Sequence, residues 1–358
     1  MKDILSMTLD ELTADLTNEK PYRAKQIYSW LHQKRAVTFD EMSDLPAALR
    51  EKLNKEHIIC RLTAVKTLVS ERDGTKKYLF ELPDGECIET VFMEYKHAHS
   101  LCISSQVGCR MGCKFCASGL DGLVRNLTPA EMLSQVYEVE RLTGETIGSL
   151  VMMGIGEPLD NYDNTIKFLT LLSDKNGKNL SLRHVSLSTC GLVPKIRELS
   201  KLHLGLTLSV SLHDSDNAKR EDIMPVTKAY NIDELIKACK EYIAETGRRI
   251  SFEYAVIAGV NDSKTDAERL IKLLRGINCH VNLIPVNNVS ETDFHNKKDN
   301  VKNFEGYLNA GKIPVTVRRT LGSDINAACG QLRKQRTEDR RQKTEDRRQK
   351  TEFGINDC

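Results

Sequence analysis

The sequence predicts an α/β protein whose main part is a partial (β/α)6 barrel of the TIM type. A small N-terminal helical domain and a short β extension are expected before it. Strand-like and helix-like segments alternate from about residue 101 to residue 319, which is typical of a parallel sheet with helical crossovers. Unusual polar motifs follow the strand-like segments, and barrels of this kind carry their chemistry at the carboxyl ends of the strands.

The first expected element is a helical domain over residues 1–58. Thr8 and Glu11 form a capping box at a helix start. An apolar stripe follows, made of Ile27, Tyr28, Trp30 and Leu31. Five basic or histidine residues surround this stripe: Arg23, Lys25, His32, Lys34 and Arg35. They would suit a phosphate backbone, although a solvated helix face remains the alternative interpretation.

The β extension is expected over residues 59–97. Three strand-like runs read LTAVKTLVS, TKKYLFELP and CIETVFMEY, and Asp-Gly turn signals at residues 73–74 and 84–85 separate them. Such runs with tight turns are typical of antiparallel strands. We therefore expect a small antiparallel sheet that leads into the barrel, with Glu89 in its last strand.

Seven strand candidates follow in the barrel domain, residues 98–332. They read LCISSQV, SLVMMG, HVSLST, GLTLSVSL, RISFEYAVI, VNLIPV and PVTVRR. Two of the intervening helices begin with strong caps, at Thr128 with Glu131 and at Asn231 with Glu234. Residues 333–358 contain a charged seven-residue repeat without an apolar stripe, so we expect a solvated helix or a disordered tail there.

The composition excludes some classes of function. Lys plus Arg is 52 and Asp plus Glu is 50, so the net charge does not indicate a nucleic-acid-binding protein. No apolar signal-peptide core follows Met1, and no run is long enough to span a bilayer. We expect a cytoplasmic protein without a membrane partner, whose 11 cysteines stay reduced. Cys60, Cys239 and Cys279 are expected as small buried hydrophobes.

Cys109, Cys113 and Cys116 are spaced C-x3-C-x2-C after a strand-like run. Three thiolates at this spacing can converge on one small inorganic group. A closed zinc site or a fully ligated cluster has four protein donors, whereas a [4Fe-4S] cluster held by three cysteines keeps one iron open. The spacing alone leaves zinc, or unrelated core cysteines, as an equal alternative.

The turn Gly154-Ile155-Gly156-Glu157-Pro158 follows the next strand. It lacks the G-x-G-x-x-G spacing of a dinucleotide site. Its glycines allow close backbone approach to a ligand, and Glu157 supplies a carboxylate for an ammonium group; a simple tight turn is the alternative. Ser188 and Ser211 end two further strands, where their hydroxyls can bind a ligand or cap a helix.

Together these motifs resemble the radical S-adenosylmethionine superfamily, and within it the RlmN/Cfr family of rRNA adenine methyltransferases. The cysteine spacing and the GEP turn carry the wider resemblance. The narrower one rests on GSDINAACGQL at residues 322–332 and on NLIPVN, MGIGEPLDN, FEYAVIAGVND and ETVFM. It covers nearly the whole chain up to Leu332, and GEP followed by Leu-Asp-Asn favours the C2-methylating branch.

The resemblance implies two cofactors. The first is a [4Fe-4S] cluster held by Cys109, Cys113 and Cys116. The second is S-adenosylmethionine, two molecules per turnover, one of them bound at the open iron. The residues implied to bind the latter are Gly156, Glu157, Ser188, Ser211, Leu212, His213 and Asn287. On its own, His213 is as readily interpreted as a packed or capping histidine.

The resemblance also implies three catalytic residues. An aromatic C2-H of adenine is not nucleophilic, so a radical route through a methylated thiol is needed. Cys329 is implied to carry the methyl group, and Glu89 to accept the proton from the adduct. Cys102 is implied to be the resolving thiol, which leaves a transient disulfide with Cys329. Without the resemblance, Cys102 on an apolar strand would be interpreted as a core residue.

The implied partners are 23S rRNA, at an adenine of the peptidyl transferase region, and tRNA, at the adenine 3' of the anticodon. An electron donor such as flavodoxin is also implied, and a monomer is expected. Five basic residues are expected to line the mouth of the barrel: Arg125, Lys219, Arg220, Arg318 and Arg319. Two alternatives remain, a C8-specific methyltransferase of the antibiotic-resistance branch and a zinc-stabilised RNA-binding protein without catalysis.

Overall fold

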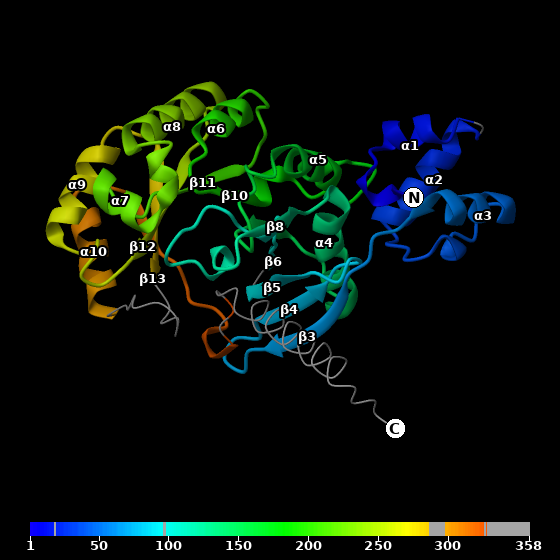
Figure 1. The fold of residues 1–358 in the computed structure, drawn as a ribbon, viewed down its shortest axis with the longest axis horizontal. Helices are drawn as coiled ribbons and strands as arrows, with labels where there is room; N and C mark the ends of the chain where they lie inside the picture. The colour runs from blue at the N-terminus through cyan, green and yellow to red at the C-terminus, as the bar shows by residue number, and fades with distance from the viewer. Residues whose placement is uncertain (18, 96–97, 286–297, 326, 328–358) are drawn as a thin grey trace, which may run out of the picture.

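The computed structural model describes residues 1–17, 19–95, 98–285, 298–325 and 327 (Figure 1). Asn287, Cys329 and the charged tail at 333–358 lie outside the described residues. Three helices at one end of the molecule form the N-terminal unit: α1 (Leu9–Asp15), α2 (Pro21–His32) and α3 (Ala47–Glu56). Two short parallel strands join its ends, β1 (Lys2–Asp3) and β2 (His57–Ile58).

The barrel is built from parallel strands that are neighbours in chain order. These strands are β6 (Ala98–Cys102), β9 (Ser149–Met152), β10 (Val185–Thr189), β11 (Thr207–Ser211), β12 (Ile250–Val256), β13 (Cys279–Pro285) and β14 (Val315–Val317). Helices connect them: α4 (Pro129–Thr143), α5 (Tyr162–Ser173), α6 (Val193–Ser200), α7 (Asn217–Ile223), α8 (Ile232–Thr246), α9 (Lys264–Leu274) and α10 (Lys298–Ala310). The predicted α/β fold with a partial barrel is confirmed.

An antiparallel meander extends the barrel sheet at its β6 edge. It contains β3 (Thr63–Val69), β4 (Lys76–Glu81) and β5 (Cys87–Tyr95), and β5 pairs with β6. The strands therefore form one ten-stranded sheet instead of a small sheet of their own. Because Val91 is paired with both Lys77 and Cys102, these three side chains share one face of the sheet.

The first barrel strand is shorter than the run LCISSQV predicts. It ends at Cys102, and residues 106–108 form a separate strand, β7 (Gln106–Gly108), antiparallel to β8 (Leu123–Asn126). The reason is that Ser104 leaves the ladder. Its hydroxyl donates to the Glu89 carbonyl (2.6 Å), and its N–H donates to Oε1 of Gln135 (2.8 Å). The cysteine loop therefore follows a short hairpin strand that is not part of the barrel.

Local signals for the helices are confirmed. Thr8, Thr128 and Asn231 each accept from the N–H three residues on, and the glutamate at that position completes each capping box. Cys60, Cys239 and Cys279 are buried in the main core, as expected. Among the described residues, no helix combines the length and apolar character that crossing a membrane requires.

Both interpretations of His32, as a phosphate contact and as part of a solvated helix face, are wrong. Its side chain is buried, and its Nδ1 lies 2.9 Å from the Tyr137 hydroxyl of α4. Burial lowers the pKa of His32 to about 4, which leaves the ring neutral at physiological pH. Tyr28 and Arg35 also bind barrel residues, Asp174 and Glu140 respectively. This side of α2 is therefore an interface with the barrel.

Candidate active site

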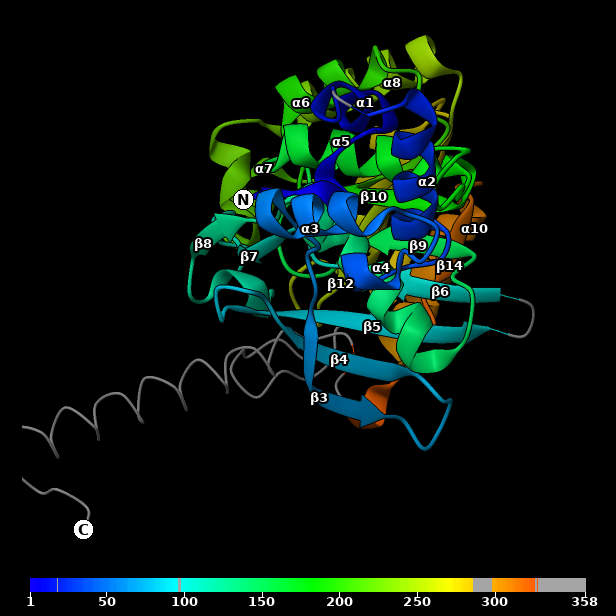
Figure 2. The same ribbon diagram turned by 90° about the vertical axis from the view of Figure 1, so that its right-hand side faces the viewer.

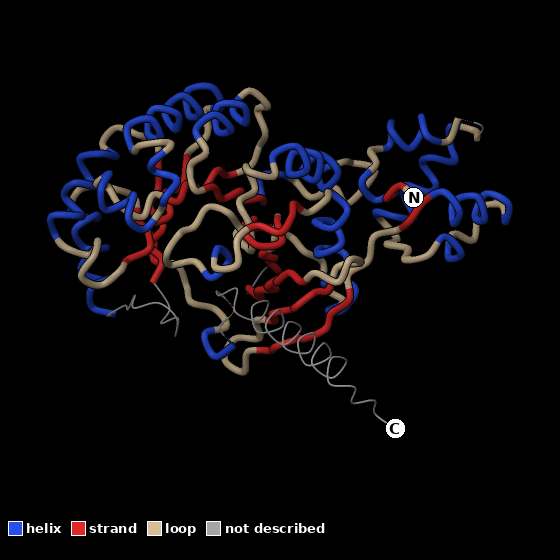
Figure 3. Tube along the Cα trace, viewed as in Figure 1, coloured by secondary structure: helices blue, strands red, loops and turns tan. Residues whose placement is uncertain are grey.

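The cysteine loop between β7 and β8 crosses the middle of the molecule, as Figure 3 shows. The Cys109 N–H donates to the Gly122 carbonyl (2.9 Å) and so joins the two ends of the loop, and in its middle the Lys114 N–H donates to the Ile223 carbonyl of α7 (3.0 Å). Within the loop the Cys116 N–H donates to the Cys113 carbonyl (3.1 Å). This hydrogen bond closes a turn that brings Cys113 and Cys116, the second and third cysteines of the motif, close together.

The electrostatics of the three thiols fit an iron-sulfur cluster. Burial, together with the neighbouring cysteines of the loop, raises the pKa of Cys109 and of Cys113 to about 12 each. Three thiolates at this place would repel one another, so they need a positively charged group between them. Coordination to metal deprotonates thiols and supplies that charge. In the described part of the chain, no three His, Cys, Asp or Glu side chains surround a single metal-ion position.

The GIGEP turn lies against the segment that follows β6. A Cβ atom at Gly156 would lie 2.6 Å from Cβ of Gln106, and one at Gly154 would lie 2.6 Å from the Ile103 carbonyl oxygen. Gly156 also has φ of +107°, which side chains rarely adopt. These two glycines are therefore required by packing within the protein itself.

Glu157 joins the GIGEP turn to the end of β10. Its carboxylate accepts from the Leu159 N–H (3.1 Å) and from the Cys190 N–H (2.7 Å). The backbone N–H of Glu157 donates to the Gln106 side chain (2.8 Å). Burial raises the pKa of Glu157, while these donors oppose the rise. The side chains of Thr189 and Cys190 also bind this carboxylate, so its lone-pair sites, about four in a carboxylate, are largely engaged within the protein.

Ser188 and Ser211 lie at the carboxyl ends of the adjacent strands β10 and β11, both half-buried. Leu212 follows directly and is fully buried. Its N–H donates to the Glu253 carbonyl and its own carbonyl accepts from Arg220. The structure thus brings Gly156, Glu157 and the three strand-end residues to one edge of the sheet.

His213 is held in an unusual backbone conformation, with φ of +57°. Asn261 fixes it by donating its side-chain amide to the His213 carbonyl (2.6 Å). The ring Nδ1 accepts from the Ala255 N–H (2.9 Å), and burial lowers the pKa of His213 to about 3. A neutral ring with Nδ1 as acceptor carries its proton on Nε2. The ring also contacts Phe115 of the cysteine loop edge-on, with centroids 4.7 Å apart.

The prediction that Arg220 lines the mouth as an RNA contact is wrong, because its side chain is completely buried. The guanidinium donates to three backbone carbonyls, those of Cys190 (2.8 Å), Ser211 (3.0 Å) and Leu212 (3.0 Å). It also donates to the Thr227 hydroxyl (2.8 Å). Arg220 therefore ties the ends of β10 and β11 to α7, on which the cysteine loop rests.

The other basic residues expected at the mouth differ in their surroundings. Arg125 pairs with Asp84 (2.6 Å) and Glu131 (2.8 Å), and Lys219 pairs with Asp266 (2.8 Å). These two cations are engaged within the protein. Arg318 is half-buried, and its Nη1 lies 3.7 Å from Sδ of Met153. Arg319 is exposed, as a nucleic-acid contact requires.

Glu89 and Cys102 lie on the same face of neighbouring strands. Oε2 of Glu89 is 2.7 Å from Nζ of Lys77, and both side chains are buried. Cys102 packs with Val91, Met93 and Ala327 in one small apolar cluster, and burial raises the pKa of its thiol. Cys102 is a free thiol. Ala327 is the last residue that the structure describes, and it precedes Cys329 by two residues. The described part of the chain therefore ends beside Cys102.

Three residues of the site were not predicted from the sequence. Lys77 is the ion-pair partner of Glu89, Gln106 binds the Glu157 backbone, and Asn261 locks His213. The signal for Lys77 was present: it is a lysine at an inward position of an alternating strand. Gln106 and Asn261 carry no such signal, because their partners are distant in the sequence.

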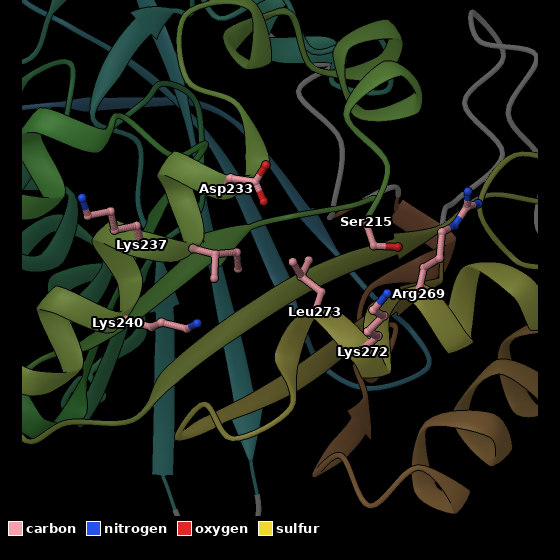
Figure 4. Close-up of a pocket in the computed structure, with 8 residues that line it drawn as sticks. Ser215, Asp233, Lys237, Lys240, Arg269, Lys272 and Leu273 are labelled. Atoms are coloured by element: carbon pink, nitrogen blue, oxygen red, sulfur yellow. The ribbon is translucent and has the colours of Figure 1, made fainter.

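A pocket of about 520 Å³ lies between α8 and α9 (Figure 4). Four basic side chains line it, those of Lys237, Lys240, Arg269 and Lys272. It shares no residue with the strand ends or with the cysteine loop. The residues that the sequence suggests for catalysis and cofactor binding therefore lie outside this pocket.

Two protein-family models match the chain. The model of the radical SAM superfamily matches residues 103–307. The model of the ribosomal RNA large subunit methyltransferase N-terminal domain matches residues 2–59. The two matches lie on the barrel and on the N-terminal helical unit.

Similar proteins are known from several bacteria. The chain is 50% identical over 339 residues to a probable dual-specificity RNA methyltransferase RlmN of Lachnoclostridium phytofermentans, covering 94% of this chain and 95% of that protein. A protein of the same description from Clostridium perfringens strain 13 is 51% identical, with 93% and 97% covered. A crystal structure of a radical SAM methyltransferase from Sphaerobacter thermophilus superposes with a TM-score of 0.89 at 43% identity, covering 92% of this chain and 99% of that one.

Proposed function

The chain belongs to the RlmN family of radical S-adenosylmethionine RNA methyltransferases, and from this premise we propose that it methylates C2 of adenine in two RNAs. The substrates are an adenine in the peptidyl transferase region of 23S rRNA and the adenine 3' of the tRNA anticodon. The observation that carries the proposal is the placement of Glu89, Cys102 and Ala327 on one face of the sheet. This arrangement suits an adduct between the adenine and Cys329.

The cofactor residues follow from the site described above. Cys109, Cys113 and Cys116 would hold a [4Fe-4S] cluster and leave one iron open. When bound, this cluster supplies the electron that cleaves S-adenosylmethionine to a 5'-deoxyadenosyl radical. Gly156, Glu157, Ser188, Ser211, Leu212, His213 and Asn287 would bind S-adenosylmethionine. Because the backbone of Leu212 is paired within the protein, its contribution would be apolar contact.

The protein's own side chains would complete the reaction. The Cys329 thiolate would take a methyl group from a first S-adenosylmethionine. The 5'-deoxyadenosyl radical would then remove one hydrogen atom from this methyl group, and the resulting carbon radical would add to C2 of the adenine. The adduct would give up its unpaired electron to the oxidised cluster. Glu89 then accepts the C2 proton, held in place by its ion pair with Lys77 (2.7 Å). Attack by the Cys102 thiolate on the Cys329 sulfur would break the sulfur–carbon bond and form a disulfide. The released carbon would take up one proton and become the methyl group at C2. Arg318 lowers the otherwise raised pKa of Cys102, which favours the attacking thiolate.

The remaining parts of the chain and its partners complete the proposal. Residues 1–58 would be an accessory RNA-binding domain, residues 59–97 a β extension and residues 98–332 the catalytic domain. The charged tail at 333–358 has no catalytic role. The enzyme would work in the cytoplasm as a monomer and receive electrons from a donor such as flavodoxin.

The proposal is tested by mapping methyl groups on rRNA and tRNA from cells that lack their own enzyme and express this chain. We expect 2-methyladenine at both positions, and its loss in a Cys329→Ala variant. Methylation at C8 would overturn the choice of carbon and favour the resistance branch. Anaerobic reconstitution with iron and sulfide should give a brown protein that cleaves S-adenosylmethionine when reduced. A colourless zinc protein would end the radical mechanism.

A further inference from the structure

Residues 322–325 are bound to the turn between β3 and β4, residues 70–75, although about 250 residues separate them in sequence. The Asp324 carboxylate accepts from the Ser70 hydroxyl (2.6 Å) and from the Glu71 N–H (3.0 Å). In the opposite direction, the Asp73 carboxylate accepts from the Gly322 N–H (2.9 Å). In Figures 1 and 2 the orange segment lies beside β3 in both views.

Each partner thus uses a carboxylate to bind the other. Hydrogen bonds to an ionised acceptor are stronger than those between neutral groups. A fourth bond joins the Arg72 guanidinium to the Ser323 hydroxyl (3.0 Å). Four hydrogen bonds from three consecutive residues on one side define the register of the contact as well as its position.

Gly322 allows the chain to return toward the sheet directly after this contact. It has φ of +61°, and a Cβ atom there would lie 2.6 Å from Cβ of Ala327 and 3.0 Å from Cγ2 of Thr75. Its carbonyl accepts from the Ile325 N–H and from the Ala327 N–H (3.0 Å). The resulting tight turn places Ala327 in the apolar cluster around Cys102.

We propose that the β3–β4 turn is a docking site that positions residues 322–325 and Ala327, and through them directs Cys329 toward Cys102. Asp73 and Asp324 are the positioning residues of this contact. The inference rests on the proposed function of Cys329. It adds to that function the part of the fold that orients the segment carrying this cysteine. Holding two reacting groups at the correct geometry raises the rate of their reaction by raising their effective concentration.

The test measures disulfide formation between Cys102 and Cys329 in the anaerobically reconstituted holoenzyme, whose cluster cysteines are protected by iron. Oxidised glutathione is the oxidant: the two thiols lose two protons and two electrons, which reduce it to two molecules of glutathione. Asp324→Ala and Asp73→Ala should slow the reaction by about tenfold. Both variants should keep the iron content of the wild type.

Asp84→Ala is the matched control. Asp84 occupies the corresponding Asp-Gly turn between β4 and β5, and its carboxylate accepts from the Glu86 N–H as that of Asp73 does from Thr75. Its other contact is Arg125 instead of residues 322–325. The control should form the disulfide within about twofold of the wild-type rate, since it alters a turn without altering the docking contact.

A second readout separates positioning from general stability. The docking variants should still cleave S-adenosylmethionine, but should produce about ten times more 5'-deoxyadenosine per methylated adenine. Gly322→Ala provides a further variant that disturbs the same contact through packing. If the Asp324 and Asp73 variants match wild type in both readouts, the docking inference is wrong. If wild type itself forms neither methylated Cys329 nor the disulfide, the proposed function is wrong instead.

Discussion

The Lys77 ammonium lies 2.7 Å from the Glu89 carboxylate, and the two side chains are only 1% and 6% exposed. Removing one partner of a buried ion pair takes away a charge that offsets the desolvation of the other. We therefore expect Lys77→Met to lower the free energy of unfolding by about 3–5 kcal/mol, measured by urea denaturation of the metal-free protein.

Lys76→Met is the control for this prediction. Lys76 is the neighbouring residue on β4, so its side chain points to the opposite face, where its ammonium lies 5.5 Å from the Phe92 ring centre. We expect a loss below about 1 kcal/mol, as for other partly exposed cations. A Lys77→Met protein as stable as the Lys76→Met protein would contradict the importance of the buried pair.

Arg220→Met should weaken the connection between the strand ends and the cysteine loop. The carbonyls of Cys190, Ser211 and Leu212 lose the guanidinium as donor, although that of Leu212 keeps a further donor, the Asp214 N–H (2.7 Å). A buried group without a partner costs about 1–3 kcal/mol, so we expect a loss of several kcal/mol in unfolding free energy and a lower iron content after reconstitution. Arg220→Lys should rescue little, since lysine lacks the planar fork.

Arg197→Met gives the comparison for Arg220. Arg197 is also a helical arginine, but its guanidinium forms a surface ion pair with Glu241 (2.6 Å). Exposed pairs contribute about 0–1 kcal/mol, so this variant should unfold and bind iron like wild type. Equal effects of the two substitutions would mean that the buried guanidinium does not hold the strand ends.

Much of the fold was predictable because its signals are local. Capping boxes and the alternation of strands and helices depend on neighbours a few residues apart, and the structure has them where the sequence indicates. Arg220 shows the limit: the helix NAKREDI is polar except for Ala218 and Ile223, and nothing within it indicates that one arginine turns inward. Its burial depends on three carbonyls from other segments, which only the assembled barrel brings together.

The candidate site also combines features that local sequence signals predict with features that they do not. The residues at the strand ends could be predicted because parallel strands present their carboxyl ends at one edge. The run LCISSQV was predicted as one strand because all its residues suit a strand. Its break after Cys102 depends on Gln135 and Glu89, which offer Ser104 alternative hydrogen bonds. Such competition from distant partners leaves no local pattern.

Acid should destabilise the protein through two buried neutral histidines. Burial lowers the pKa of His32 to about 4 and of His213 to about 3, whereas an unfolded histidine titrates near 6.5. Below pH 6.5 the unfolded state therefore binds protons that the folded state does not, so stability falls as the pH decreases. Each histidine should contribute a slope of up to about 1.4 kcal/mol per pH unit, from pH 6.5 down to its folded pKa.

The His32 part of this effect can be isolated with His32→Gln. Urea denaturation between pH 4 and 7 should give a shallower pH dependence for this variant than for wild type. His203→Gln removes an exposed histidine and should leave the wild-type slope unchanged. Parallel curves for wild type and His32→Gln would show that His32 becomes protonated in the folded state.

Gly156→Ala should impair binding of S-adenosylmethionine by displacing the GIGEP turn. The added Cβ would lie 2.6 Å from Cβ of Gln106 and 2.7 Å from its backbone nitrogen, and φ of +107° adds strain. Since the Glu157 N–H binds the Gln106 side chain, the carboxylate would shift with the turn. We expect about tenfold weaker binding to the reconstituted protein by equilibrium dialysis, because positioning within about 0.5 Å is needed for a functional site.

Gly259→Ala separates strain from collision. Gly259 also has a positive φ, +75°, but a Cβ there meets nothing within 4 Å. The Gly259→Ala substitution should therefore lower the free energy of unfolding by about 1 kcal/mol. It should not weaken the affinity for S-adenosylmethionine. If both alanine variants bound the ligand as wild type does, the turn would tolerate the displacement and Gly156 would not be required for binding. If both weakened binding equally, backbone strain alone would explain the loss, and the contact with Gln106 would not be the cause.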